Sequence, residues 1–325
     1  MKNILVVGGA GYIGSHQTRY LLDKGFKVVV FDNLSRGHRE FVDKRATFFQ
    51  GDLLSKDDVH YVFLNHHFDA VMHFAAFALV GESVKQPGTY YDNNITGVLN
   101  LLHAMNEFGV KKIIFSSSAA VYGEPSRIPI SEYDELKPIN PYGWTKRMTE
   151  QILKDFDIAH GIKSVSLRYF NAAGAAYGLG ELHKPETHLI PNVLLAALTG
   201  KAVEMLGSDY PTPDGTCVRD YIHVLDLVRA HHLALEFLFN HNETRSYNLG
   251  SGTGYSVKKV IEMCKEVTGI DIPVKISPRR PGDPAILVAS SEKIAKELSW
   301  KPELSLKKII SSAWEWRNNE KIIIT

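Results

Sequence analysis

Near its N-terminus the chain reads ILVVGGAGYIG, from Ile4 to Gly14. An aliphatic run is followed by glycines at positions 8, 11 and 14, and then by a stretch with neither glycine nor proline. This order predicts a β-strand, a tight turn and the start of a helix. Small residues in such a turn let the backbone approach a pyrophosphate, whose charge is stabilised by free N–H groups and the helix dipole. The stretch therefore predicts a dinucleotide-binding fold.

Short β-branched and aliphatic runs continue through the first 170 residues, with longer helical segments between them. We predict strands at Ile4–Val7, Lys27–Phe31, Ala46–Gln50, Ala70–Phe74, Lys112–Ser116 and Lys163–Tyr169. This alternation is typical of a parallel sheet covered by helices. The predicted fold class is α/β, a Rossmann-type doubly wound parallel sheet that places ligands at the C-terminal ends of its strands.

The pattern becomes less regular after Asn171. Glycine and proline gather in Gly174–Pro185 and Tyr210–Gly215, between apolar helical stretches such as Ile190–Leu198 and Asp226–Phe239. We expect residues 1–170 to form an NAD-binding Rossmann domain. Residues 171–325 are expected to form a smaller C-terminal substrate-binding lobe, with some of the chain returning to the Rossmann domain.

Composition limits the classes of partner. The formal net charge is +1 without long runs of one sign, so we expect neither nucleic acid nor a membrane surface as a partner. The two cysteines, Cys217 and Cys264, lie far apart, which excludes a disulfide framework and favours a reducing cytoplasm. No apolar run approaches the roughly 20 residues that span a bilayer, and Met1–Val7 lacks the layout of a secretory signal.

Two aspartates follow predicted strands at the cofactor edge. Asp32 ends the second strand, where a carboxylate would accept hydrogen bonds from ribose hydroxyls. It favours NAD over NADP because it would repel a 2′-phosphate, although Arg36 lies nearby. Asp52 follows the third strand, where it could bind the adenine amino group or simply hold its own turn.

A tyrosine and a lysine form the candidate catalytic pair. Tyr142 and Lys146 are four residues apart, just after Asn140 and Pro141, a suitable N-cap and first helical residue. Both side chains should therefore share one helix face. An ammonium beside a phenol favours the phenolate, so we expect a lowered tyrosine pKa and general acid–base chemistry. Ser118, at the end of the fifth strand, could bind the same substrate oxygen.

These motifs resemble those of the extended short-chain dehydrogenase/reductase family, and in particular its members that invert UDP-sugars at C4. The likeness covers nearly the whole chain. It runs through Gly8–His16, Phe31–Gly37, Val80–Ser83, Tyr90–Asn94, Phe115–Gly123, Asn140–Lys146, Leu167–Ala175 and Asp214–Leu227. The last block, DGTCVRDYIHVLDL, is the most specific.

The resemblance implies two sets of site residues. The NAD site would contain Gly8, Gly11, Tyr12, Ile13, Gly14, Asp32, Asn33, Asp52, Leu53, Phe74, Asn93, Tyr142, Lys146 and Phe170. The UDP-sugar would meet Ser118, Tyr142, Asn171, Leu189, Arg219, Arg280 and Asp283. Arginine is chemically suited to bind a diphosphate with two parallel hydrogen bonds. A homodimer is a further expectation from the family.

The implied reaction is a redox cycle without net redox. Tyr142 takes the proton of the C4 hydroxyl while hydride passes from C4 to NAD, and the 4-keto sugar turns its other face to receive the hydride back. We expect interconversion of UDP-galactose and UDP-glucose, with the N-acetylhexosamine forms left open. Ala78, His188 and Leu287 depart from residues found in some relatives, so the sugar preference stays open.

Other functions are less well supported. A 4,6-dehydratase of this family would carry an Asp-Glu pair where Ala119 and Ala120 stand, and a decarboxylase would need a basic site that the sequence does not display. A non-catalytic NAD-binding regulator would be expected to lack the tyrosine or the lysine. We expect no metal, because the pairs His66–His67 and His231–His232 lack grouped carboxylates or cysteines.

Overall fold

The chain divides into two compact units. A computed structural model describes residues 1–280 and 283–320. Unit 1 comprises Met1–Gly123, Glu135–Arg168 and Val228–Tyr247. Unit 2 comprises Glu124–Asp134, Tyr169–Leu227 and the described part of Asn248–Thr325. Each unit is therefore built from segments that are far apart in the sequence.

A seven-stranded sheet has the order β10-β6-β5-β4-β1-β2-β3. Its strands are β1 (Asn3–Val7), β2 (Lys27–Asp32), β3 (Thr47–Gln50), β4 (Ala70–His73), β5 (Lys112–Ser118), β6 (Lys163–Tyr169) and β10 (Arg245–Leu249). β1 pairs in parallel with both β2 and β4, so the chain winds outward from β1 in two directions. The predicted fold class and all six predicted strands are confirmed, and β10 was not predicted.

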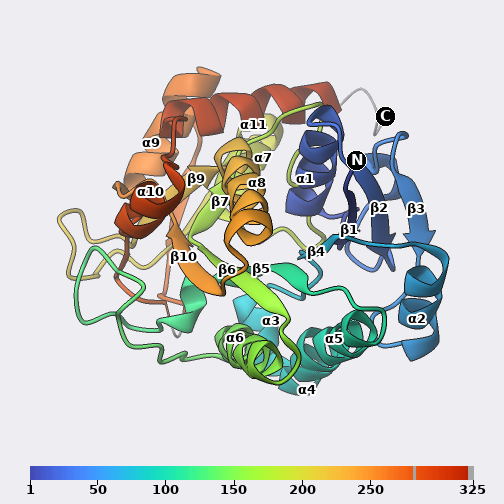
Figure 1. The fold of residues 1–325 in the computed structure, drawn as a ribbon. Helices are drawn as coiled ribbons and strands as arrows, with labels where there is room; N and C mark the ends of the chain where they lie inside the picture. The colour runs from blue at the N-terminus through green and yellow to red at the C-terminus, as the bar shows by residue number, and fades with distance from the viewer. Residues whose placement is uncertain (281–282, 321–325) are drawn as a thin grey trace. The chain divides into compact units, whose positions relative to one another are not determined.

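Helices cover both faces of this sheet (Figure 1). One face carries α1 (Tyr12–Asp23) and α8 (Val224–His241), and the other carries α2 (Lys56–Asn65), α5 (Gly97–Glu107) and α6 (Pro141–His160). Leu5, Phe63, Leu101 and Leu153 belong to one buried core between the sheet and this second layer. Short helices α3 (Val80–Lys85) and α4 (Pro87–Tyr91) and a π-helical turn (Asp92–Thr96) precede α5.

Unit 2 holds two small sheets. In one, β9 (Val218–His223) pairs with β7 (Asn171–Ala173), β11 (Gly254–Ser256) and β13 (Ile286–Leu287), and in the other β8 (Val203–Leu206) pairs with β12 (Val274–Ser277). The helices are α7 (Leu189–Thr199), α9 (Val257–Thr268), α10 (Glu292–Leu298) and α11 (Leu306–Glu320). Val193, Val260 and Ile309 join α7, α9 and α11 in one buried core.

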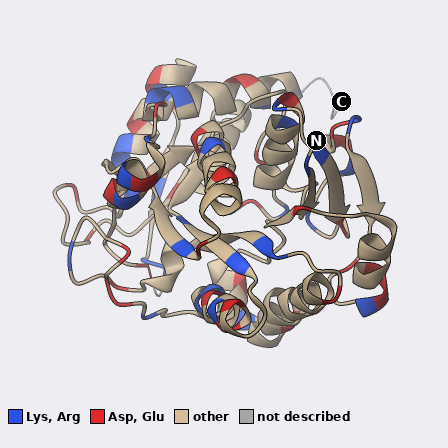
Figure 2. Ribbon diagram, in the orientation of Figure 1, with Lys and Arg blue, Asp and Glu red and all other residues tan. Residues whose placement is uncertain are grey.

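Charge is mixed along the chain. Lys and Arg positions are interspersed with Asp and Glu positions, as Figure 2 shows on α9 and α10. Among the described residues, no helix is long and apolar enough to cross a membrane.

Candidate active site

The glycine turn after β1 has no room for side chains at two positions. Gly8 has a φ of +79°, and a Cβ there would lie 2.4 Å from the backbone nitrogen of Ala75. A Cβ at Gly14 would lie 2.2 Å from the carbonyl oxygen of Gly8. α1 begins after Gly11, which offers no side chain to cap the helix. Glycine at these two positions thus lets the turn pack closely on the backbone around it, and the free N–H groups at the N-terminus of α1 can accept a phosphate as their partner.

Asp32 is tied to this turn. Its Oδ2 accepts a hydrogen bond from the Ala10 N–H (3.0 Å), and its Oδ1 accepts one from the Leu34 N–H (2.8 Å). Burial raises the pKa of Asp32, while these two hydrogen bonds act in the opposite direction. The carboxylate is therefore held in one orientation at the C-terminal end of β2.

Asp52 holds the turn after β3. Its Oδ1 accepts a hydrogen bond from the Leu54 N–H (2.8 Å), and its Oδ2 accepts one from Asn33 Nδ2 (3.0 Å). These hydrogen bonds support one of the two roles considered for Asp52, that of holding its own turn. Its binding of the adenine amino group stays a prediction. A pyrophosphate cradle with a fixed carboxylate one strand away fits an adenine dinucleotide.

Tyr142 and Lys146 occupy one face of α6. The Asn140 side chain caps this helix by accepting a hydrogen bond from the Gly143 N–H (2.9 Å). Lys146 is buried, its Nζ donates to the Ser116 carbonyl (2.7 Å), and this nitrogen lies 5.8 Å from the centroid of the Tyr142 ring. The local sequence accounts for this placement, because Asn140 and Pro141 start the helix just before the pair.

The expected lowering of the tyrosine pKa is wrong for this structure. Burial raises the pKa of Tyr142, and only a hydrogen bond with the Ser118 side chain acts against it. Burial also lowers the pKa of Lys146 to about 7, although the Glu150 carboxylate acts in the opposite direction. A lysine whose pKa is lowered in this way carries less positive charge at neutral pH than an exposed lysine, so it stabilises a phenolate less.

The three serines that end β5 have different partners. Ser116 offers its carbonyl oxygen to Lys146, and the Ser117 hydroxyl donates to Glu150 Oε1 (2.7 Å). The Ser118 hydroxyl accepts a hydrogen bond from the Ala120 N–H (3.2 Å) and bonds the Tyr142 side chain. Of the three side chains, that of Ser118 is the one brought together with Tyr142.

A buried ion pair between Glu150 and Arg168, next to the catalytic helix residues, was not predicted. Arg168 Nε and Nη2 donate to the two carboxylate oxygens of Glu150 (2.9 and 2.7 Å), and Arg168 Nη1 donates to the Tyr122 hydroxyl (2.7 Å). Both charged side chains are almost completely buried. One signal was in the sequence, because Glu150 follows Lys146 by four residues and must share its helix face.

The buried, neutral imidazole of His73, the last residue of β4, was also not predicted from the sequence. It is buried, and neither ring nitrogen has a hydrogen-bond partner among the described residues. Burial and the charge of Lys146 lower the pKa of His73 to about 3, so its imidazole is neutral at physiological pH.

The candidate residues divide between the units. Phe170, Asn171, Leu189, Arg219, Arg280 and Asp283 lie in unit 2, and all the other candidates lie in unit 1. In unit 2, Arg219 Nη2 lies 3.8 Å from Asp283 Oδ1, and the Asp283 N–H donates to the Arg280 carbonyl (3.3 Å). Leu287 of β13 is the register partner of Arg219 in β9. These residues therefore form one local group.

The other unit 2 candidates lie at the ends of neighbouring elements. Asn171 opens β7, and its Nδ2 donates to the Asp220 carbonyl of β9 (3.1 Å). Phe170 is buried, and Leu189 is the first residue of α7.

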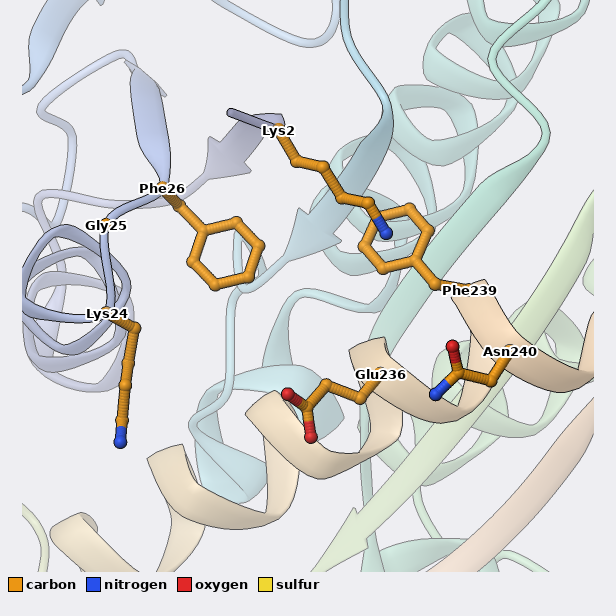
Figure 3. A pocket seen from close by; sticks show the side chains of 7 residues that line it. All are labelled: Lys2, Lys24, Gly25, Phe26, Glu236, Phe239 and Asn240. Atoms are coloured by element: carbon orange, nitrogen blue, oxygen red, sulfur yellow. The ribbon is translucent and has the colours of Figure 1, made fainter.

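A surface pocket of unit 1 contains none of the candidates. It is lined by Lys2, Lys24, Gly25, Phe26, Glu236, Phe239 and Asn240 (Figure 3). The Lys2 ammonium lies 3.1 Å from the centroid of the Phe239 ring, a cation–π contact. None of the lining residues belongs to the candidate active site.

Comparison with known proteins identifies the family. The model of the NAD dependent epimerase/dehydratase family matches residues 4–250. The chain belongs to this family. A member from Lacticaseibacillus casei, a UDP-glucose 4-epimerase, is 50% identical over 97% of this chain and 97% of its own length.

Solved structures of family members have the same fold. The UDP-glucose 4-epimerase of Brucella ovis in complex with NAD superposes with a TM-score of 0.93 at 45% identity, covering 97% of this chain and 98% of that one. The enzyme of Bifidobacterium longum in complex with NAD⁺ and UDP gives 0.94 at 42% identity, covering 98% and 99%. The predicted family and NAD dependence are confirmed.

Proposed function

We propose that the chain interconverts UDP-galactose and UDP-glucose by inverting C4 through a 4-keto intermediate. The observation that carries this proposal is the group of Ser118, Tyr142 and the buried Lys146, in the same unit as the glycine turn. The relatives with this activity match the chain from end to end. Ala119 and Ala120, which follow Ser118 in a 3₁₀ turn, offer no acid or base for a dehydration.

Each catalytic residue has a defined task. Ser118 orients the C4 hydroxyl toward the Tyr142 oxygen, which takes its proton and returns it once the ketone presents its other face. Lys146, anchored by the Ser116 carbonyl, supplies positive charge close to the Tyr142 ring. When bound, NAD would supply the hydride acceptor and the positive charge of an oxidised nicotinamide, which would favour the Tyr142 phenolate against the effect of burial.

The glycine turn would hold the pyrophosphate of NAD, and Asp32 would bind the adenosine ribose. The remaining cofactor contacts are assigned to Tyr12, Ile13, Asn33, Asp52, Leu53, Phe74, Asn93 and Phe170. Arg219 and Arg280 would bind the diphosphate of the substrate, with Asn171, Leu189 and Asp283 beside it.

The test is conversion of UDP-galactose to UDP-glucose by purified protein without added NAD, repeated with UDP-N-acetylgalactosamine. Conversion of the first sugar supports both the reaction and a retained cofactor. Conversion of the second sets the breadth of the sugar site. If neither sugar is converted after NAD is supplied, the proposed reaction fails.

We also propose that the protein is a cytoplasmic homodimer. The location is supported by Cys217 and Cys264, which are both unpaired and buried. Light scattering coupled to size exclusion tests the dimer, because a monomer mass at micromolar concentration would contradict it.

A further inference from the structure

Four side chains that the proposed reaction does not use converge in unit 2. Glu181, His183, Glu186 and His188 each place one potential ligand atom within 4.8 Å of the others. They lie in the eight residues before α7, whose first residue is Leu189. The described residues contain no second group of this kind that includes histidines.

Four His–Glu distances within this Glu₂His₂ cluster lie near the spacing of ligand atoms in a tetrahedral metal site. His188 Nδ1 lies 2.9 Å from both Glu181 Oε1 and Glu186 Oε1. His183 Nδ1 lies 3.2 Å from Glu181 Oε1 and 3.8 Å from Glu186 Oε2. Zinc bonds of about 2.0–2.1 Å arranged as a tetrahedron separate neighbouring ligand atoms by about 3.3 Å. The observed separations bracket that value.

Two ligand atoms of the cluster lack a hydrogen bond although they are buried. Glu186 Oε1 accepts hydrogen bonds from the N–H groups of Thr187 and His188 (both 2.8 Å), which fix the carboxylate. Glu186 Oε2 and His183 Nδ1 are buried and make no hydrogen bond. Buried polar atoms in native proteins nearly always have a hydrogen-bond partner, and a metal ion bound between these two atoms would give each of them a partner.

Ion pairing is the competing explanation for the cluster. Burial disfavours charge on the histidines, yet the two carboxylates raise the pKa of His183 to about 9 and that of His188 to about 10. The pKa of each glutamate is lowered in turn. The cluster is thus either two buried ion pairs or a set of four metal ligands, and metal binding would require both imidazoles to lose a proton.

We propose that Glu181, His183, Glu186 and His188 bind one zinc ion at a closed structural site. Two imidazoles and two carboxylates suit zinc, and four protein ligands leave no position for a reacting water. The ion would cross-link the segment 181–188 and so fix the start of α7. The proposal departs from the sequence expectation of no metal, which considered only adjacent histidine pairs and which the metal-content measurement below would test.

The first test is metal content. Tag-free protein is loaded with Zn²⁺, dialysed against metal-free buffer and assayed by mass spectrometry, with about one zinc per chain expected. The variants Glu181→Gln and His183→Gln should lose the zinc. His67→Gln and Glu204→Gln, at exposed positions, should keep it. Folded wild-type protein that retains no zinc, or variants that retain as much as the controls, would overturn the proposal.

A second test does not depend on the folding of variants. Wild-type protein loaded with Co²⁺ should show the intense visible absorption of a tetrahedral site, and Zn²⁺ should abolish it. A chelator should also lower the thermal midpoint of zinc-loaded wild type. Weak absorption typical of octahedral Co²⁺ would overturn the proposal, and so would a thermal midpoint that neither zinc nor chelator changes. The cluster would then be two buried ion pairs. Because neither readout uses turnover, these outcomes are separate from those of the epimerase assay.

Discussion

The Tyr142 hydroxyl is the atom on which the proposed chemistry depends. Tyr142→Phe keeps the ring and removes the group that bonds Ser118. We expect kcat for UDP-galactose to fall by about 10²–10⁴-fold, the usual contribution of a general acid–base group, with NAD binding retained. Tyr133→Phe is the control, since Tyr133 is 83% exposed. An unchanged kcat in Tyr142→Phe would favour the non-catalytic regulator.

Lys146 gives stability a specific pH dependence. Its pKa is about 7 in the folded chain, below the value of about 10.4 for an unperturbed lysine. The unfolded chain therefore binds more protons between pH 7 and pH 10, and stability rises with pH across this window. Urea unfolding of wild type and Lys146→Met at pH 7 and pH 9.5 tests this. The unfolding free energy of wild type, relative to that of Lys146→Met, should be higher at pH 9.5 than at pH 7. The same relative value at both pH values would contradict the lowered pKa of Lys146.

The sequence predicts that Tyr142 and Lys146 share a helix face, but it does not predict the direction of their pKa shifts. The four-residue spacing after Asn140 and Pro141 is local information, because it fixes a helix start and a shared face. The direction of the pKa shift depends on burial by distant elements, which no local pattern records. The same limit explains why His73 was missed, since its burial comes from the packed sheet.

At the scale of elements, α6 and β6 are joined by the Glu150–Arg168 ion pair. Arg168→Met would leave the Glu150 carboxylate buried without its partner, and we expect a loss of about 3–5 kcal/mol in unfolding free energy. Adding Glu150→Gln should recover part of this loss, because no unpaired charge remains. Lys275→Met, which removes an exposed ion pair with Glu204, should change stability by no more than about 0.5 kcal/mol. Equal effects of the buried and exposed substitutions would contradict this account.

Strands were predictable where aliphatic residues ran together. β1 and β2 are buried on both faces and therefore show as continuous apolar runs. β10 has the sequence RSYNL, and its polar residues gave no such signal although the strand joins the same sheet. The short strands β7, β11 and β13 of unit 2 depend on pairing with β9, which is a tertiary contact that sequence periodicity does not contain.

At the scale of the whole molecule, the two units carry different candidate ligand groups. The glycine turn and Asp32 belong to unit 1, and the Glu₂His₂ cluster belongs to unit 2. The glycine motif was recognisable because its spacing is contiguous in sequence. The cluster follows an E-x-H-x-x-E-x-H spacing in an irregular segment, so only the folded loop shows that its four side chains converge.

Cofactor choice can be measured through the stability of the whole chain. A ligand that binds only the folded state stabilises it by about 2.7 kcal/mol at one hundred times its Kd, so NAD should raise the thermal midpoint of cofactor-free protein. NADP at the same concentration should raise it less, because its 2′-phosphate would meet the Asp32 carboxylate held by Ala10 and Leu34. Asp32→Asn should make the rises in thermal midpoint caused by NAD and by NADP more nearly equal, because it removes that repulsion. Equal shifts for NAD and NADP in wild type would mean that Arg36, which now pairs with Glu82, turns to the phosphate and that Asp32 does not select the cofactor.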